Sequence, residues 1–178
     1  MTDQAQLEPL YSPEIIARRL NSLTGEIAAC MPTDFVLIAI LKGSFIFAAD
    51  LVRSLVNEGV NPEVDFMILS SYGEATSSRG FVKLLRDTEL EIKDRHVLLV
   101  DDILDSGKTL EFACRHLQEK GAKSTKVCVL LDKASSVKRP NKSADFVGFY
   151  CPDAFVVGYG MDYAHKFRGL PFIAILCQ

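Results

Sequence analysis

The chain has 178 residues, of which 48% are hydrophobic and 24% are charged, and its formal net charge is -3. The length suits one domain with a core of its own, and the composition is that of an ordinary globular protein. A slight excess of negative charge disfavours nucleic acid and anionic membranes as partners, since both attract basic surfaces, but it leaves room for a local basic pocket.

The first predicted elements are a helix and a buried strand. Ser12 is a favourable N-cap and Pro13 suits the first helical position, so a helix is predicted from here to about Ala29. The continuous apolar run Phe35–Leu41 (FVLIAIL) is typical of a strand that is buried on both faces. A short turn then leads to a second predicted helix, Phe45–Val56.

The second half of the chain continues the alternation of strand and helix. A polar segment, Ser70–Gly80, separates two predicted strands, and the apolar runs HVLLV and KVCVLL predict two buried strands on either side of a third helix, Gly107–Lys120. The strands predicted after Leu41 cover residues 64–69, 81–85, 96–100, 126–131, 146–149, 155–159 and 172–176.

This alternation predicts an α/β fold. Right-handed βαβ units give a mainly parallel sheet that helices cover on both faces, and we expect one domain over residues 1–178. Ligands of such sheets bind beyond the carboxyl ends of the strands. The ends that deserve inspection are therefore residues 41–44, 101–109 and 131–133.

The most informative segment is VLLVDDILDSGKT, residues 97–109. Its apolar strand leads to the adjacent carboxylates Asp101 and Asp102, and Asp105 follows after a short spacer. Residues 106–109 open a helix, whose first N–H groups and dipole favour an anion such as phosphate. Because carboxylates repel phosphate, the acidic pair is expected to address a ribose diol or a magnesium ion.

Other interpretations of the same residues fit less well. A Walker A loop would need glycine at the position of Asp102. A dinucleotide fingerprint would need glycine at Tyr163, after Gly158 and Gly160. A plain capped helix after a buried strand does not account for three acidic residues within five positions, which are costly at a buried strand end.

The segment resembles the phosphoribosyl pyrophosphate (PRPP) motif of the type I phosphoribosyltransferases, and the resemblance extends over nearly the whole chain. It implies a twisted, mainly parallel sheet with a small hood subdomain formed by the N-terminal and C-terminal segments. It also implies that Asp101 and Asp102 contact the ribose hydroxyls, while the loop over residues 105–109 cradles the 5′-phosphate. Leu41-Lys42-Gly43 resembles the family's pyrophosphate loop, whose Leu–Lys peptide bond is typically cis.

The aspartate at position 105 resembles that of the hypoxanthine–guanine members of the family, which implies a catalytic role at purine N7. The residues implied to bind PRPP are Leu41, Lys42, Gly43, Asp101, Asp102, Asp105, Ser106, Gly107, Lys108, Thr109 and Arg168. The residues implied to bind the purine are Ile103, Lys133, Phe155, Val156 and Asp162. Those implied to hold Mg²⁺ are Asp101, Asp102 and Asp162, and those implied in a closing lid are Ser71 and Tyr72.

The resemblance implies a purine-salvage enzyme that transfers the phosphoribosyl group of PRPP to hypoxanthine or guanine, giving IMP or GMP and pyrophosphate. It further implies a homodimer or homotetramer. An alternative from another class is an RNA-binding regulator of pyrimidine genes, since some proteins of this fold have that role. Those regulators usually lack an acid at position 105 and need a basic face. The preference among hypoxanthine, guanine and xanthine stays open.

Cysteine usage and the opening segment predict the compartment. The five cysteines are odd in number and form no Cys-x-x-Cys pair, which favours free thiols in a reducing compartment. The opening residues MTDQAQLEPLYSPEI lack the basic-then-apolar pattern of a secretory signal, and no apolar run approaches the ~20 residues of a membrane helix. We therefore expect a cytoplasmic protein without a membrane or nucleic-acid partner.

Overall fold

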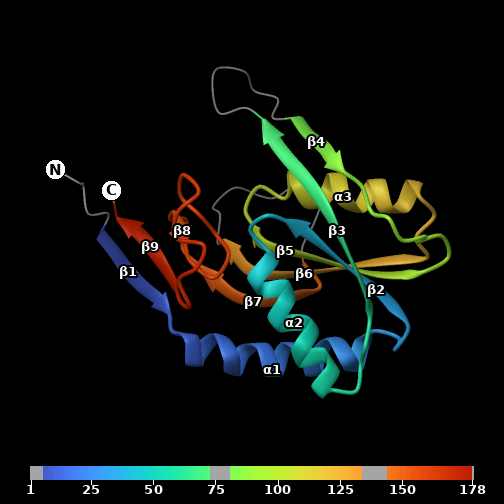
Figure 1. The fold of residues 1–178 in the computed structure, drawn as a ribbon, viewed down its shortest axis with the longest axis horizontal. Helices are drawn as coiled ribbons and strands as arrows, with labels where there is room; N and C mark the ends of the chain where they lie inside the picture. The colour runs from blue at the N-terminus through green and yellow to red at the C-terminus, as the bar shows by residue number, and fades with distance from the viewer. Residues whose placement is uncertain (1–5, 73–80, 134–143, 178) are drawn as a thin grey trace.

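The computed structural model describes residues 6–72, 81–133 and 144–177 (Figure 1). Within these residues the strands form a core sheet of six and a small sheet of three. The elements in chain order are β1 (Gln6–Tyr11), α1 (Pro13–Cys30), β2 (Phe35–Leu41), α2 (Phe45–Asn57), β3 (Glu63–Tyr72), β4 (Phe81–Arg86), β5 (His96–Leu104), α3 (Lys108–Glu119), β6 (Ser124–Lys133), β7 (Phe146–Cys151), β8 (Val156–Val157) and β9 (Ile173–Cys177).

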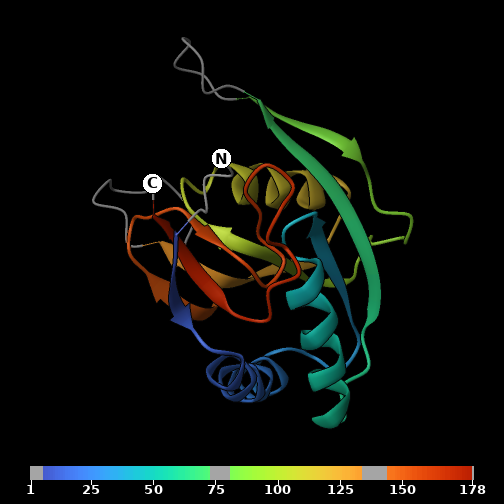
Figure 2. The same ribbon diagram turned by 60° about the vertical axis from the view of Figure 1, so that its left-hand side comes forward.

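The core sheet has the strand order β4-β3-β2-β5-β6-β7. All neighbouring pairs are parallel except β3 with β4, which is antiparallel at one edge. Helices α1 and α2 cover one face and α3 covers the other (Figures 1 and 2). The predicted α/β fold with a mainly parallel sheet is thereby confirmed.

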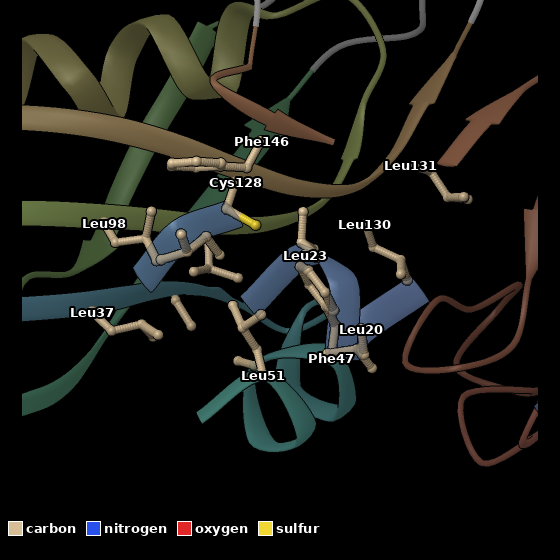
Figure 3. Close-up of a cluster of buried hydrophobic side chains, with 14 of the residues drawn as sticks. Leu20, Leu23, Leu37, Phe47, Leu51, Leu98, Cys128, Leu130, Leu131 and Phe146 are labelled. Atoms are coloured by element: carbon tan, nitrogen blue, oxygen red, sulfur yellow. The ribbon is translucent and has the colours of Figure 1, made fainter. Parts of the chain in front are cut away.

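Strand β2 shows why the sheet is covered on both faces. Phe35, Leu37 and Ala39 join the hydrophobic cluster beneath α1 and α2, whereas Val36 and Ile38 join the cluster beneath α3. All five side chains are fully buried, so a run without polar alternation is what this strand requires. Figure 3 shows the first cluster, in which leucines of α1 and α2 meet those of β2, β5 and β6.

The predicted start of α1 is confirmed by its cap. Ser12 Oγ accepts a hydrogen bond of 3.4 Å from the Ile15 N–H, and Pro13 occupies the first helical position. The helix ends at Cys30, one residue beyond the predicted end. Its buried side chains recur at helical spacing, as in Ile16 and Leu20, and pack on the sheet.

Several elements differ from their predicted bounds, and three strands illustrate the physical reasons. Strand β5 was predicted over residues 96–100 but continues through Asp101 and Asp102 to Leu104, because β6 goes on pairing with it (Asp101 with Val129). Strand β8 is shorter than predicted, with two residues. Strand β1 was not predicted, because its sequence QLEPLY has no strand periodicity; it forms by antiparallel pairing with β9.

The small sheet has the order β1-β9-β8 and is built from the two ends of the described chain. It lies beside one end of the core sheet (Figure 1), in the place of the predicted hood. Strand β3 runs on to Tyr72, and residues 73–80 of the predicted lid lie outside the described residues. Among the helices described, α1 to α3, none combines the length and the apolar character needed to cross a membrane.

Candidate active site

A cleft of about 630 Å³ opens at the carboxyl ends of β2 and β5. It brings together two of the three strand ends that the sequence singled out. The residues that line it are Ile40, Leu41, Lys42, Gly43, Leu69, Val82, Asp101, Asp102, Ile103, Leu104, Asp105, Ser106, Gly107, Lys108, Thr109 and Leu110. The Leu41–Lys42 peptide bond in its wall is cis, as the resemblance implies.

Two neighbouring carboxylates occupy the floor of this cleft. Asp101 is 6% exposed, and its Oδ1 accepts a 3.0 Å hydrogen bond from the Asp102 N–H. Burial, and then the adjacent charge of Asp102, raise the pKa of Asp101 well above its usual value. Burial also raises the pKa of Asp102, although the nearby charge of Arg168 opposes this shift. Such a pair gains from a hydroxyl donor or a cation between its oxygens, which fits a ribose diol or Mg²⁺.

The start of α3 lies beside the acidic pair and has the features that favour an anion. Gly107 is its N-cap with φ of 79°, and its carbonyl accepts a 2.9 Å hydrogen bond from the Glu111 N–H. Among the described residues no side chain caps this helix start. Ser106, Lys108 and Thr109 line the cleft at the same point. The free N–H groups of the first turn and the helix dipole therefore favour a phosphate here.

The purine end of the predicted site is marked by a lysine at the end of β6. Lys133 Nζ lies 3.5 Å from Asp105 Oδ2 and 3.7 Å from Asp153 Oδ1. The parallel pairing of β5 with β6 brings these strand ends together, since Leu104 is the partner of Asp132. The ammonium group of Lys133 thus lies near two carboxylates, and one of them, Asp105, also lines the cleft. This arrangement can donate a hydrogen bond to a carbonyl oxygen and accept one from a ring nitrogen.

The aromatic side chain predicted at the base lies on the segment that leads into β8. Phe155 is 46% exposed and meets Tyr163 edge to face, with ring centroids 5.6 Å apart. Val156 follows as the first residue of β8 and is buried. Ile103 belongs to β5 and lines the cleft with the acidic pair. An exposed ring of this kind offers a face on which a purine can stack.

The late predicted residues Asp162 and Arg168 bind each other. Arg168 Nη2 lies 2.6 Å from Asp162 Oδ1, and Arg168 Nη1 donates a 2.7 Å hydrogen bond to the Gly160 carbonyl. The second oxygen of Asp162 accepts from the His165 N–H at 2.8 Å. Arg168 is close enough to Asp102 for its charge to lower the pKa of that carboxyl.

The predicted magnesium ligands do not form one ready-made group. Over residues 6–72, 81–133 and 144–177, no three acidic, histidine or cysteine side chains gather as a metal site. Asp101 and Asp102 lie together, whereas Asp162 is engaged by Arg168. One or two carboxylates suit Mg²⁺ when water and substrate phosphates supply the remaining ligands. The residues present therefore fit a metal that is bound together with its substrate.

A family model described as "Phosphoribosyl transferase domain" matches residues 11–164. The chain belongs to this phosphoribosyltransferase family. It is 44% identical over 168 residues to the hypoxanthine-guanine phosphoribosyltransferase of Bacillus subtilis, covering 94% of this chain and 91% of the relative. It is 47% identical over 141 residues to the hypoxanthine phosphoribosyltransferase of Escherichia coli, covering 79% and 77%.

Solved structures agree with this membership. A hypoxanthine-guanine phosphoribosyltransferase from Bacillus anthracis, with a HEPES molecule in its active site, superposes with a TM-score of 0.89 at 40% identity. The match covers 98% of this phosphoribosyltransferase and 100% of that chain. A hypoxanthine phosphoribosyl transferase of Trypanosoma cruzi matches with a TM-score of 0.88 at 37% identity, covering 99% and 94%.

Two contacts of the phosphoribosyltransferase site were not predicted from the sequence. A Cβ atom on Gly43 would lie 1.7 Å from Asp102 Oδ2, so the loop at Gly43 touches the acidic pair directly. A Cβ atom on Gly160, whose φ is 105°, would lie 2.1 Å from the Gly43 carbonyl oxygen. Glycines in strand-like runs often mark close backbone approaches, and Gly160 directly follows the predicted strand at 155–159.

Proposed function

We propose that this phosphoribosyltransferase transfers the phosphoribosyl group of PRPP to hypoxanthine or guanine, giving IMP or GMP and pyrophosphate. The observation that carries the proposal is the position of Asp105, between the phosphate-binding start of α3 and the ammonium group of Lys133. The relatives named for the same reaction with hypoxanthine and guanine support it. The five thiols are free, as a reducing cytoplasm requires, and we place the reaction there.

The charge of PRPP is distributed over two groups of the site. When pyrophosphate leaves C1′, positive charge develops on the ribose ring and negative charge on the leaving group. Lys42 and Arg168 would neutralise the pyrophosphate, while residues 106–109 hold the 5′-phosphate in line. The carboxylates of Asp101 and Asp102 would hold the ribose hydroxyls and, with substrate oxygens, Mg²⁺, which supplies further positive charge to the leaving group.

The purine would be placed by residues outside the cleft wall, next to Asp105 and on the segment that leads into β8. Lys133 would donate a hydrogen bond to the 6-oxo group, Phe155 would stack on the ring, and the backbone at Val156 would contact its edge. Asp105 would accept the proton at N7 while N9 attacks C1′. Ile103 would form an apolar wall, and Asp162 would act through its ion pair with Arg168.

A lid over the cleft is part of the same proposal. An oxocarbenium-like centre reacts with water, so the site must close during the transfer. Leu69 of β3 and Val82 of β4 line the cleft, so both of these strands border it. Ser71 and Tyr72 end β3 and would begin this lid.

The test is product formation. Purified protein with PRPP, Mg²⁺ and hypoxanthine or guanine should give IMP or GMP and pyrophosphate, measured by chromatography, and chelation of the metal should abolish the product. Absence of product from hypoxanthine, guanine and xanthine at high protein concentration would disprove the function. Filter binding with pyrimidine leader RNA tests the regulator alternative, and we expect no specific complex.

Replacement of Gly43 should impair the enzyme strongly. In Gly43→Ala the new methyl group would enter the space of Asp102 Oδ2, so either the loop or the acidic pair must move. Displacement by about 1 Å costs on the order of 10²-fold in kcat/KM. Gly25→Ala is the matched control, since a Cβ at that α1 position meets no atom within 4 Å. Equal rates for the two variants would contradict the close contact.

An apolar face supports the homo-oligomer that the resemblance implies. Phe45, Ala49 and Val56 follow one stripe of α2, and the first and last are 43% and 50% exposed. Val64 and Phe66 of β3 are 37% and 41% exposed. Val64 and Phe66 pair with Leu37 and Ala39 of β2, whose side chains point toward α2. Val64 and Phe66 therefore lie on the same side of the sheet as α2 and next to that helix. We propose that a second copy of this chain covers this face as a dimer.

We expect light scattering to show a dimer, or a dimer of dimers, at micromolar concentration. Phe66→Glu should shift the mass to that of a monomer, because a charge in an apolar interface is costly. Tyr150→Glu is the control: Tyr150 is 70% exposed on β7, at the opposite edge of the core sheet, and should leave the mass unchanged. A monomeric unmodified protein would refute the dimer.

A further inference from the structure

A partly buried hydrogen bond links α2 to the C-terminal segment. The Tyr159 hydroxyl donates to Asp50 Oδ2 at 2.5 Å, and Tyr159 is only 6% exposed. Burial, together with this acceptor and its charge, raises the pKa of Tyr159, so the phenol keeps its proton and stays a donor. Asp50 also pairs with Arg53 one turn further along the helix. The proposed chemistry uses none of these three side chains.

Asp50 and Tyr159, the two residues joined by this hydrogen bond, are each connected to the Lys42-Gly43 loop. Asp50 lies six residues after Ser44, the N-cap of α2, which is about 9 Å along the helix axis. Ser44 is fully buried, and its hydroxyl donates to the Ile40 carbonyl, so loop and helix start are held as one unit. Figure 2 shows the C-terminal loop (red) beside this end of α2 (cyan).

On the other side, Tyr159 is followed by the residue that touches the loop. Gly160 approaches the Gly43 carbonyl so closely that a Cβ atom would lie 2.1 Å from its oxygen. The Gly160 carbonyl in turn accepts the hydrogen bond from Arg168 Nη1, and its N–H donates to the Arg168 carbonyl at 2.9 Å. The position of Arg168 relative to the Lys42-Gly43 loop therefore depends on the backbone contact between Gly160 and Gly43.

From these contacts we infer that Tyr159 and Asp50 are positioning residues for pyrophosphate, which hold Arg168 in register with the Lys42-Gly43 loop. The inference rests on the proposed function, because it assigns a role within the same site. Neither side chain lines the cleft, so each acts through Gly160 and the start of α2. The proposed purine residues are Lys133, which ends β6, and Asp105, which directly follows β5, and they take no part in these contacts.

The inference predicts a selective change in substrate affinity. Tyr159→Phe keeps the ring and removes only the hydroxyl. The KM for PRPP, and that for pyrophosphate in the reverse reaction, should rise about tenfold, the scale of one hydrogen bond to a charged group. The KM values for hypoxanthine and IMP should stay within about twofold. A purely structural contact would lower the melting temperature without this split between substrates.

Matched variants complete the experiment. Tyr11→Phe removes another hydroxyl hydrogen bond, of 2.6 Å to the Tyr150 carbonyl, and should leave the KM for PRPP unchanged. Asp50→Ala, at a helical position that favours alanine, should reproduce the effect of Tyr159→Phe, whereas Asp50→Asn keeps an acceptor and should restore most of the affinity. If Tyr159→Phe folds poorly, the KM for PRPP of Asp50→Ala tests the same hydrogen bond.

The double variant Tyr159→Phe with Asp50→Ala should be no worse than either single change, because both remove the same contact. Additive effects, or a KM for PRPP that does not move in an active enzyme, would overturn the inference. An inactive unmodified protein would instead overturn the proposed function, so the two failures are distinct.

Discussion

Replacing Asp105 by asparagine should lower turnover by about 10²–10⁴-fold, the usual scale for a general base. The amide keeps the size of the side chain but cannot take the proton from the purine. Asp105 is the one carboxylate that both lines the cleft and lies next to Lys133 Nζ, at 3.5 Å, among the residues described. Steady-state rates with saturating PRPP and hypoxanthine measure the loss, and the KM for PRPP should change little.

Asp153→Asn is the matched control for this prediction. Asp153 lies 3.7 Å from Lys133 Nζ, with its side chain 71% exposed, and it is not part of the cleft wall. The substitution removes the same charge from beside the same lysine, so it reports any effect that acts only through Lys133. Turnover should stay near normal. If Asp105→Asn and Asp153→Asn behave alike, Asp105 is not the base.

Exclusion of adenine is the second large effect that we expect. The unmodified enzyme should prefer hypoxanthine to adenine by about 10⁴-fold in kcat/KM, the scale on which a site built for one hydrogen bond rejects an analogue that lacks it. In the proposed site Lys133 would donate a hydrogen bond that the 6-oxo group accepts. The 6-amino group of adenine is another donor, so both groups would lose their partners.

Competition between the two bases, with both nucleotides quantified by chromatography, gives the ratio directly. Lys133→Gln offers an amide that can donate or accept a hydrogen bond. It should reduce the preference for hypoxanthine over adenine by about 10²-fold, mainly because hypoxanthine is used more slowly. Phe155→Leu is a useful comparison, because weaker stacking should slow both bases to a similar degree. Efficient use of adenine by the unmodified protein would contradict the assignment of Lys133.

Much of this protein is determined by patterns that are local in the sequence. The bounds of β2 coincide with the predicted Phe35–Leu41, because a strand buried on both faces must be apolar throughout. The cap at Ser12 and the segment at 101–109, which we propose to bind phosphate, are likewise local, since neighbouring residues supply all of their groups. Parallel topology then sends the strand ends to one edge, and the cleft follows.

The rest depends on residues that are far apart in the chain. β1 becomes a strand only because β9 supplies hydrogen-bond partners, as in the pairing of Gln6 with Cys177, and β5 passes through Asp101 because β6 continues beside it. The contacts of Gly160 with Gly43 and of Tyr159 with Asp50 each join segments more than 100 residues apart. Such contacts leave no periodicity in the sequence, because periodicity records which face of an element is buried and not which residue covers it. Only the tertiary structure decided them.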